Sequence, residues 1–193
     1  MPQPEALIAD LGGGSAASFA GTRALHEALV EPLSDADATI QSMEDASPAK
    51  WHLAHTTWFW ETFLLRDHLD EYVLHDERFP FLFNSYYEAE GERHVRDRRG
   101  MLSRPTVAEI LDWRAAVNDA MEPLLNREDL QPLIALGIAH EQQHIELLLT
   151  DIKHALFQNP IGPAMWTSPA TPSSATERAW HEHPGGIARI GHD

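Results

Sequence analysis

Cysteine is absent from the 193 residues of this chain. Its absence excludes disulfide bonds, zinc or iron–sulfur sites with thiolate ligands, and a cysteine nucleophile. Basic residues are also scarce, because 14 Lys and Arg stand against 30 Asp and Glu and give a net charge of −16. Such a charge disfavours nucleic-acid binding, which depends on cationic contacts with phosphates. A metal site in this chain would have to use imidazoles and carboxylates.

Targeting and membrane signals are missing too. The N-terminal segment contains Glu5 and Asp10 and has no basic start, so it does not resemble a secretory signal. The longest apolar stretch, residues 133–139, is far shorter than the ~20 residues that span a bilayer. The sequence therefore predicts a cytoplasmic protein with no membrane partner.

Helix signals, in contrast, are abundant. Capping boxes begin at Ser34 and Thr106, and Ser47 followed by Pro48 predicts a helix capped by serine with proline at its first position. The predicted main helices span about residues 19–30, 47–69, 106–125 and 129–157. Residues 70–105 are irregular and rich in aromatic side chains. Four helices with one long crossover loop predict an all-α four-helix bundle.

Composition divides the chain into three parts. Residues 1–18 are predicted to form a flexible N-terminus, and residues 19–160 the bundle. Residues 161–193 contain a Pro- and Ser-rich linker, after which residues 180–191 have the pattern of a turn entering a strand. Since this strand has no visible partner, we expect it to be the first piece of a further domain that is missing from a truncated chain.

The most informative motif lies in residues 139–146, AHEQQHIE. His140 and His144 are one helical turn apart and about 40° apart in azimuth, so both can reach one metal ion. Glu146 lies roughly 160° from His144, which favours a supporting position beside the ligands over direct ligation. An isolated pair of this kind is often incidental, so a second observation is needed.

A second histidine pair, His52 and His55, lies in residues 51–55 on another predicted helix. Bundle cores build metal sites from side chains on facing helices, so one of the two could complete a three-histidine face with His140 and His144. Three neutral ligands suit Fe(II), Zn(II) or a similar divalent ion, and the sequence does not choose among them. The alternative is that His52 and His55 are ordinary core or interface residues.

The same residues also match the His-Glu-x-x-His signature of zinc peptidases, with Glu141 as general base. The extended form of that motif needs a glycine and a third histidine where this sequence has Leu147 and Thr150. The sequence also shows no sheet of the kind with which such enzymes bind substrates. A zinc metallopeptidase is therefore the second hypothesis.

Four segments occur in a fixed order: residues 47–59 (SPAKWHLAHTTWF), 83–87 (FNSYY), 99–106 (RGMLSRPT) and 140–146 (HEQQHIE). Together they resemble the N-terminal half of the ergothioneine-biosynthesis sulfoxide synthases, or hercynine oxygenases, and the related ovothiol-pathway enzymes. The resemblance covers about residues 19–160 and the end at 185–191. It implies a DinB-like four-helix bundle followed by a formylglycine-generating-enzyme-like domain.

The resemblance implies a mononuclear non-haem Fe(II) site on His55, His140 and His144. We expect His52, Glu141 and Glu146 to support these ligands without binding the ion. Another divalent metal could occupy the site in the isolated fragment. The implied reaction uses O2 to join a thiol, cysteine or gamma-glutamylcysteine, to the imidazole of N-alpha-trimethylhistidine, and it oxidises the sulfur. The sequence does not distinguish ergothioneine-type from ovothiol-type regiochemistry.

Two arginines of the crossover loop, Arg96 and Arg99, are candidates to hold the carboxylates of the thiol substrate. The alternative is a solvated loop whose arginines offset the acidic charge. The family's proton-donor tyrosine belongs to the missing domain, so no catalytic residue is assigned and the fragment is expected to be inactive alone. A third hypothesis is thus a non-catalytic DinB-like metal-binding module. Self-association is also expected, because a missing domain would leave aromatic residues of 79–87 uncovered.

Overall fold

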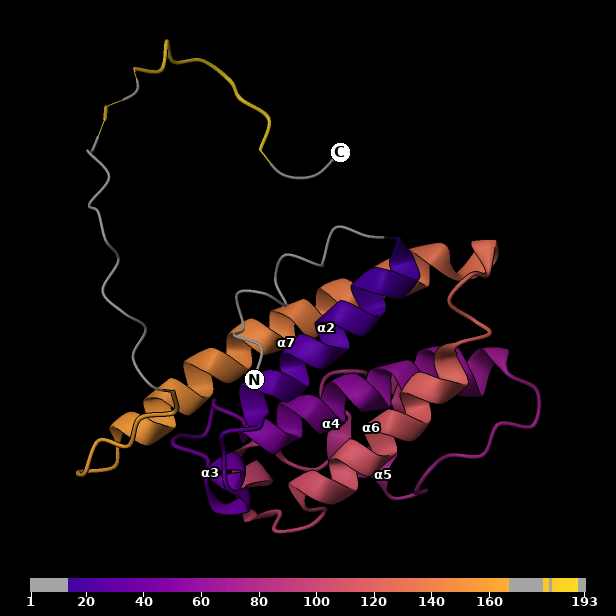
Figure 1. Ribbon diagram of the computed structural model, residues 1–193, viewed down its shortest axis with the longest axis horizontal. Coiled ribbons are helices and arrows are strands. Elements are labelled where there is room, and N and C mark those ends of the chain that lie inside the picture. Colours follow the sequence, from indigo (N-terminus) through magenta and orange to yellow (C-terminus); the bar gives the residue numbers. More distant parts are fainter. Residues whose placement is uncertain (1–13, 167–178, 181, 191–193) are drawn as a thin grey trace.

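The computed structural model describes residues 14–166, 179–180 and 182–190, and within them the chain is a helix bundle (Figure 1). The long helices are α2 (Ser15–Val30), α4 (Ala49–Trp60) with its π-helical continuation η1 (Glu61–Arg66), α6 (Val107–Met121) and α7 (Gln131–Phe157). Short helices and turns join them: α3 (Asp35–Thr39), α5 (Phe79–Phe83), η2 (Glu88–Glu90), η3 (Arg96–Met101) and η4 (Glu128–Leu130). The predicted all-α bundle is confirmed.

The helix ends follow local sequence signals in most places. Both predicted capping boxes are present, at Ser34 before α3 and at Thr106 before α6. Helix α2, however, begins at Ser15 and so includes residues 15–18 of the predicted flexible N-terminus. The rest of that segment, residues 1–13, lies outside the described residues.

The predicted start of α4 is wrong by one residue. Pro48 is the N-cap of this helix, and the Ser47 hydroxyl makes no capping hydrogen bond to it. Instead, the Ser47 backbone N–H donates to Asp151 and its hydroxyl accepts from Arg99. Tertiary partners therefore outcompete the local cap, because they satisfy the same polar groups.

Helix α4 is the centre of the bundle, and all 12 of its residues are buried. It packs against α2, α6 and α7, which surround it in Figure 1. The approach of α4 to α7 depends on Gly137, because a Cβ there would lie 2.5 Å from the Trp60 ring. The absence of a side chain at this position lets the indole lie directly on the α7 backbone.

The crossover segment between η1 and α6 is anchored to the bundle by aromatic packing. Phe79 and Phe83 of α5 are buried and lie 4.6 Å and 5.7 Å, between ring centroids, from Trp113 of α6. At the other end of the segment, the Gln41 side chain accepts a hydrogen bond from the backbone N–H of Gly100 in η3. These contacts bring the arginines of η3 beside the first turn of α4.

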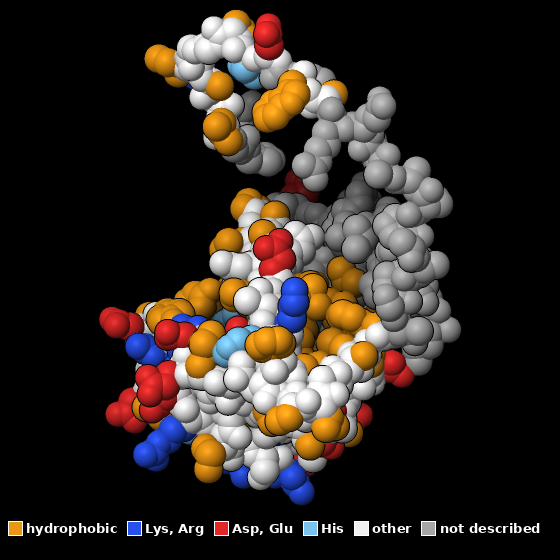
Figure 2. All heavy atoms as spheres, turned by 90° about the vertical axis from the view of Figure 1, so that its left-hand side faces the viewer, with side chains coloured by type: hydrophobic (Ala, Val, Ile, Leu, Met, Phe, Trp, Pro, Cys, Tyr) orange, Lys and Arg blue, Asp and Glu red, His pale blue; other side chains and the backbone are white. Residues whose placement is uncertain are grey.

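The segment after α7 turns back over the end of the bundle. Met165 and Trp166 line an apolar groove of ≈ 420 Å³ with Leu149, Ile152 and Leu156 of α7. Figure 2 faces this end of the molecule and shows hydrophobic side chains gathered there. Exposed apolar surface at this end is therefore contributed by α7 and the residues that follow it.

The predicted strand near the C-terminus is not formed in residues 180 and 182–190, the part of that segment that the structure describes. Ile187 and Ile190 are exposed there, and a segment without a paired strand lacks the ladder hydrogen bonds that define a sheet. Most of the predicted linker lies outside the described residues. Within the described part of the chain, no helix has the length and apolar character needed to cross a membrane.

Candidate metal centre

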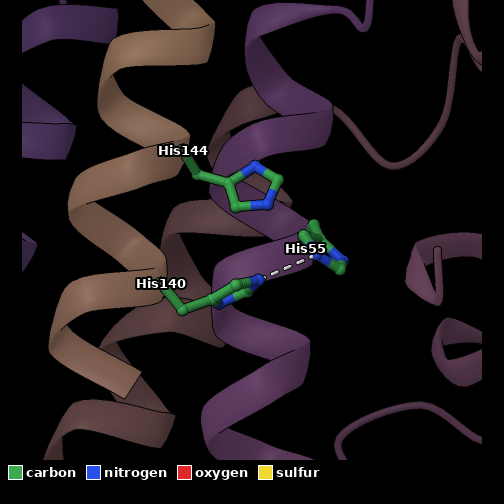
Figure 3. Close-up of side chains that lie close together, drawn as sticks. All are labelled: His55, His140 and His144. Atoms are coloured by element: carbon green, nitrogen blue, oxygen red, sulfur yellow. Dashed lines mark hydrogen bonds between the residues drawn. The ribbon is translucent and has the colours of Figure 1, made fainter. Parts of the chain in front are cut away.

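Three histidines from two neighbouring helices converge at one point in the bundle (Figure 3). His55 comes from α4, and His140 and His144 come from consecutive turns of α7. One ring nitrogen from each lies within 4.8 Å of the others, and Nε2 of His140 is 3.2 Å from Nε2 of His55. The structure thus brings together the three histidines that the sequence motifs single out.

Hydrogen bonding orients His55 toward this point. Its Nδ1 lies 2.6 Å from the backbone oxygen of Phe83, which can only accept, so Nδ1 carries the proton. The lone pair of a neutral His55 is therefore on Nε2, the nitrogen that faces His140. A buried nitrogen of His140, Nδ1, has no hydrogen-bond partner among the described residues.

Burial keeps the three imidazoles uncharged at neutral pH. It lowers the pKa of His140 to about 4. Burial, with the neighbouring imidazoles as a second cause, also lowers the pKa values of His55 and His144 well below their usual range. Neutral imidazole is the form that binds a metal, and three convergent nitrogen donors suit Fe(II) or Zn(II). The residues present therefore fit a divalent cation.

His52 does not join the triad but contacts one member of it. Its Nδ1 lies 2.9 Å from Nδ1 of His144, and its Nε2 lies 3.1 Å from a carboxylate oxygen of Asp151. Asp151 was not singled out from the sequence. Its position seven residues after His144 places it on the same face of α7, which is the signal that could have revealed it.

Glu141, next to His140 in sequence, lies on a different side of α7 in a buried cluster of charges. Its carboxylate forms ion pairs with Arg23, at 3.2 Å, and with Arg114. It also contacts Nδ1 of His26 at 3.1 Å and accepts a hydrogen bond from the Trp60 indole at 2.9 Å. The side chain is fully buried. It ties α7 to α2, α4 and α6.

This placement argues against the zinc-peptidase hypothesis. A general base must reach a water or substrate proton beside the metal, whereas both oxygens of Glu141 are occupied in the buried cluster. Glu141 therefore supports the position of the helix that carries the ligands, without a contact to the triad. Glu146, the other carboxylate of the motif, is exposed to solvent.

A cavity of ≈ 330 Å³ opens over the triad. Its lining includes all three histidines together with His52, Asp151, Trp51, Ser85, Tyr86, Tyr87, Arg96 and Arg99. Both arginines predicted to bind substrate thus share one cavity with the histidines. Arg96 is exposed, and it donates hydrogen bonds to the Tyr86 hydroxyl and to the backbone oxygen of Asp45.

Arg99 is held rigidly in the wall of this cavity. It is 4 % exposed, and it donates hydrogen bonds to the hydroxyls of Ser47 (2.9 Å) and Ser85 (3.2 Å). Its guanidinium lies 3.4 Å from the centroid of the Trp51 ring, a cation–π arrangement. Burial, then the charge of Arg96, lowers the pKa of Arg99 to about 9, which leaves it charged at neutral pH.

The charge of Arg99 is not neutralised by an ion pair in the described part of the chain. The carboxylates there lie beyond salt-bridge distance, although that of Asp151 attracts the guanidinium across the cavity, and the buried Nε of Arg99 has no acceptor. Burying a cation without a counter-charge is costly. The cavity wall thus carries a buried cation that has no ion-pair partner among the described residues, a feature that suits an anionic ligand.

Comparison with known proteins identifies the fold. Residues 18–148 match the DinB superfamily, a span that covers more than half of the chain and includes all three histidines of the triad. A comparison with curated proteins found no match. This chain belongs to the DinB superfamily.

Proposed function

We propose that this chain binds one mononuclear Fe(II) ion through His55, His140 and His144 and acts as the iron-binding half of an O2-dependent sulfoxide synthase. The observation that supports it most directly is the shared cavity, in which three neutral imidazoles lie near an arginine that lacks an anionic partner. The order of the four sequence motifs supports the same family. When bound, the ion would supply the redox chemistry that uses O2 to join a thiol to an imidazole.

The arginines would position the thiol substrate. The carboxylate of cysteine or gamma-glutamylcysteine would accept charge-assisted hydrogen bonds from Arg99 and Arg96, which both line the cavity. The contact with Trp51 and the hydrogen bonds to Ser47 and Ser85 hold the guanidinium in place for these bonds. The resemblance places the proton-donor tyrosine and much of the pocket for N-alpha-trimethylhistidine on a second domain.

Thiol binding can be tested on this chain directly. Protein loaded anaerobically with Fe(II) is titrated with cysteine and with gamma-glutamylcysteine in a calorimeter. The Arg99→Gln variant is expected to bind the thiol about 10- to 100-fold more weakly, because a hydrogen bond to a charged group contributes about 1.5–3 kcal/mol. Its Fe(II) content is expected to stay stoichiometric. Arg98→Gln, a change in an exposed neighbouring arginine, is the matched control.

Turnover is tested by mass spectrometry of mixtures of N-alpha-trimethylhistidine, thiol and O2. We expect C–S bond formation only when a formylglycine-generating-enzyme-like domain accompanies the bundle. Absence of Fe(II) binding would refute the proposal. Fe(II) binding with no thiol affinity in the wild-type protein would instead favour a non-catalytic metal-binding module.

A further inference from the structure

His52 lies between a carboxylate and a metal-ligand candidate, and its contacts determine where the protons are. Asp151 as a carboxylate can only accept, so Nε2 of His52, 3.1 Å away, must donate. A neutral imidazole has one N–H, which leaves a lone pair on Nδ1 of His52. That lone pair faces Nδ1 of His144 at 2.9 Å, so His144 must donate from Nδ1.

We propose that Asp151 and His52 are positioning residues that hold His144 in the tautomer protonated at Nδ1. The lone pair of His144 is then on Nε2 and available to the metal site. The assignment of a metal rests on the proposed function, whereas the tautomer does not. His55 is arranged in the same way, because its Nδ1 donates to the backbone oxygen of Phe83.

The reverse arrangement is disfavoured by the same contacts. If His52 donated from Nδ1 to His144, its Nε2 lone pair would face the Asp151 carboxylate, and two acceptors would oppose each other at 3.1 Å. A doubly protonated His52 would avoid this, but the side chain is 2 % exposed and burial disfavours the charged form. Asp151 is itself fixed, since it also accepts from the Ser47 backbone N–H at 2.8 Å.

The hydrogen-bonded chain from Asp151 through His52 to His144, called the relay below, also affects how tightly a metal would bind. A metal-binding imidazole that donates its second N–H to an outer acceptor becomes more basic, and so binds the metal more tightly. Losing such an outer partner typically lowers metal affinity about 10- to 100-fold. We therefore expect His52→Leu, which removes the acceptor, to weaken Co(II) binding by about this factor. His52→Asn offers a side-chain oxygen near the position of Nδ1, and it is expected to restore part of the affinity. Asp151→Asn is expected to weaken binding, and Asp119→Asn, an exposed acid on α6, is the matched control.

The deciding measurement is long-range proton–nitrogen NMR of the metal-free protein, which reports histidine tautomers directly. Wild-type His144 is expected to be protonated at Nδ1, and His52→Leu is expected to give a mixture of tautomers. Wild-type His144 protonated at Nε2 would overturn the proposal, whether or not the variants fold. A third outcome would separate the two proposals. If wild-type His144 is protonated at Nδ1, His52→Leu gives a mixture of tautomers and the wild-type protein binds no Co(II), the relay would be supported and the metal site refuted.

Discussion

The buried carboxylate of Glu141 offers the sharpest test of how the α7 motif is used. Glu141→Gln keeps the size of the side chain and removes its charge. A peptidase would lose activity through this change and keep its fold. In the structure, the change removes the counter-charge that the buried guanidinium groups of Arg23 and Arg114 share. Arg114 keeps its ion pair with Glu27, whereas Arg23 keeps none among the described residues, so the expected loss is one of stability.

The expected effect is large. Removing one partner of a buried ion pair costs about 3–5 kcal/mol, because the remaining charge stays desolvated. In a chain of this size each kcal/mol changes the melting temperature by about 2–4 °C, so Glu141→Gln is expected to lower Tm by about 6–20 °C. Native domains are stable by only about 5–15 kcal/mol, so this loss is a large fraction of the total and partial unfolding at room temperature would also agree with this reasoning.

Thermal unfolding followed by circular dichroism provides the measurement. Glu146→Gln on the same helix is the control, because this carboxylate is exposed and its loss is expected to leave Tm unchanged. Equal melting temperatures for the wild-type protein and Glu141→Gln would refute the assignment of a stabilising role to the cluster.

The other predictions concern the three histidines and the contact between Gly137 and Trp60. Changing His55, His140 or His144 to Ala should each abolish stoichiometric Fe(II) binding, measured by metal analysis of protein prepared anaerobically; full occupancy in any of the three would contradict the ligand set. Co(II) at about 100 times its Kd should stabilise the wild-type fold by about 2.7 kcal/mol, seen as a higher Tm that a chelator reverses. Gly137→Ala should lower Tm although alanine favours helices, because its Cβ would meet the Trp60 ring at 2.5 Å and overpacking costs about 1–3 kcal/mol. An unchanged or higher Tm would show that the indole can move.

Helix positions could be predicted from the sequence wherever the signals are local. The capping boxes at Ser34 and Thr106 involve residues three apart, and both are formed. Ser47 has an equally good local signal, yet its polar groups bind Arg99 and Asp151, which are 52 and 104 residues away. A local pattern does not contain those competing partners.

The site shows the same limit. Spacing and family resemblance were enough to single out His140 and His144, since they need only share one helical face. The direction of Glu141 depends on Arg23, which lies 118 residues away in α2 and carries no motif of its own. In the string His-Glu-x-x-His, the two histidines line a cavity, whereas the glutamate holds α7 against its neighbouring helices. A sequence pattern cannot distinguish these two roles.

Because α4 is completely buried, the rate of metal uptake at the triad can be compared with the rate of hydrogen exchange in this helix. Amides of a helix enclosed on all sides exchange with solvent hydrogen only when the bundle opens cooperatively, which is a rare event. The cavity over the triad, in contrast, is open to solvent in the folded state through its exposed Arg96 and Tyr86 rim. We therefore expect metal uptake, measured with Co(II), to be many times faster than deuterium uptake by the α4 amides, because it does not require the bundle to open.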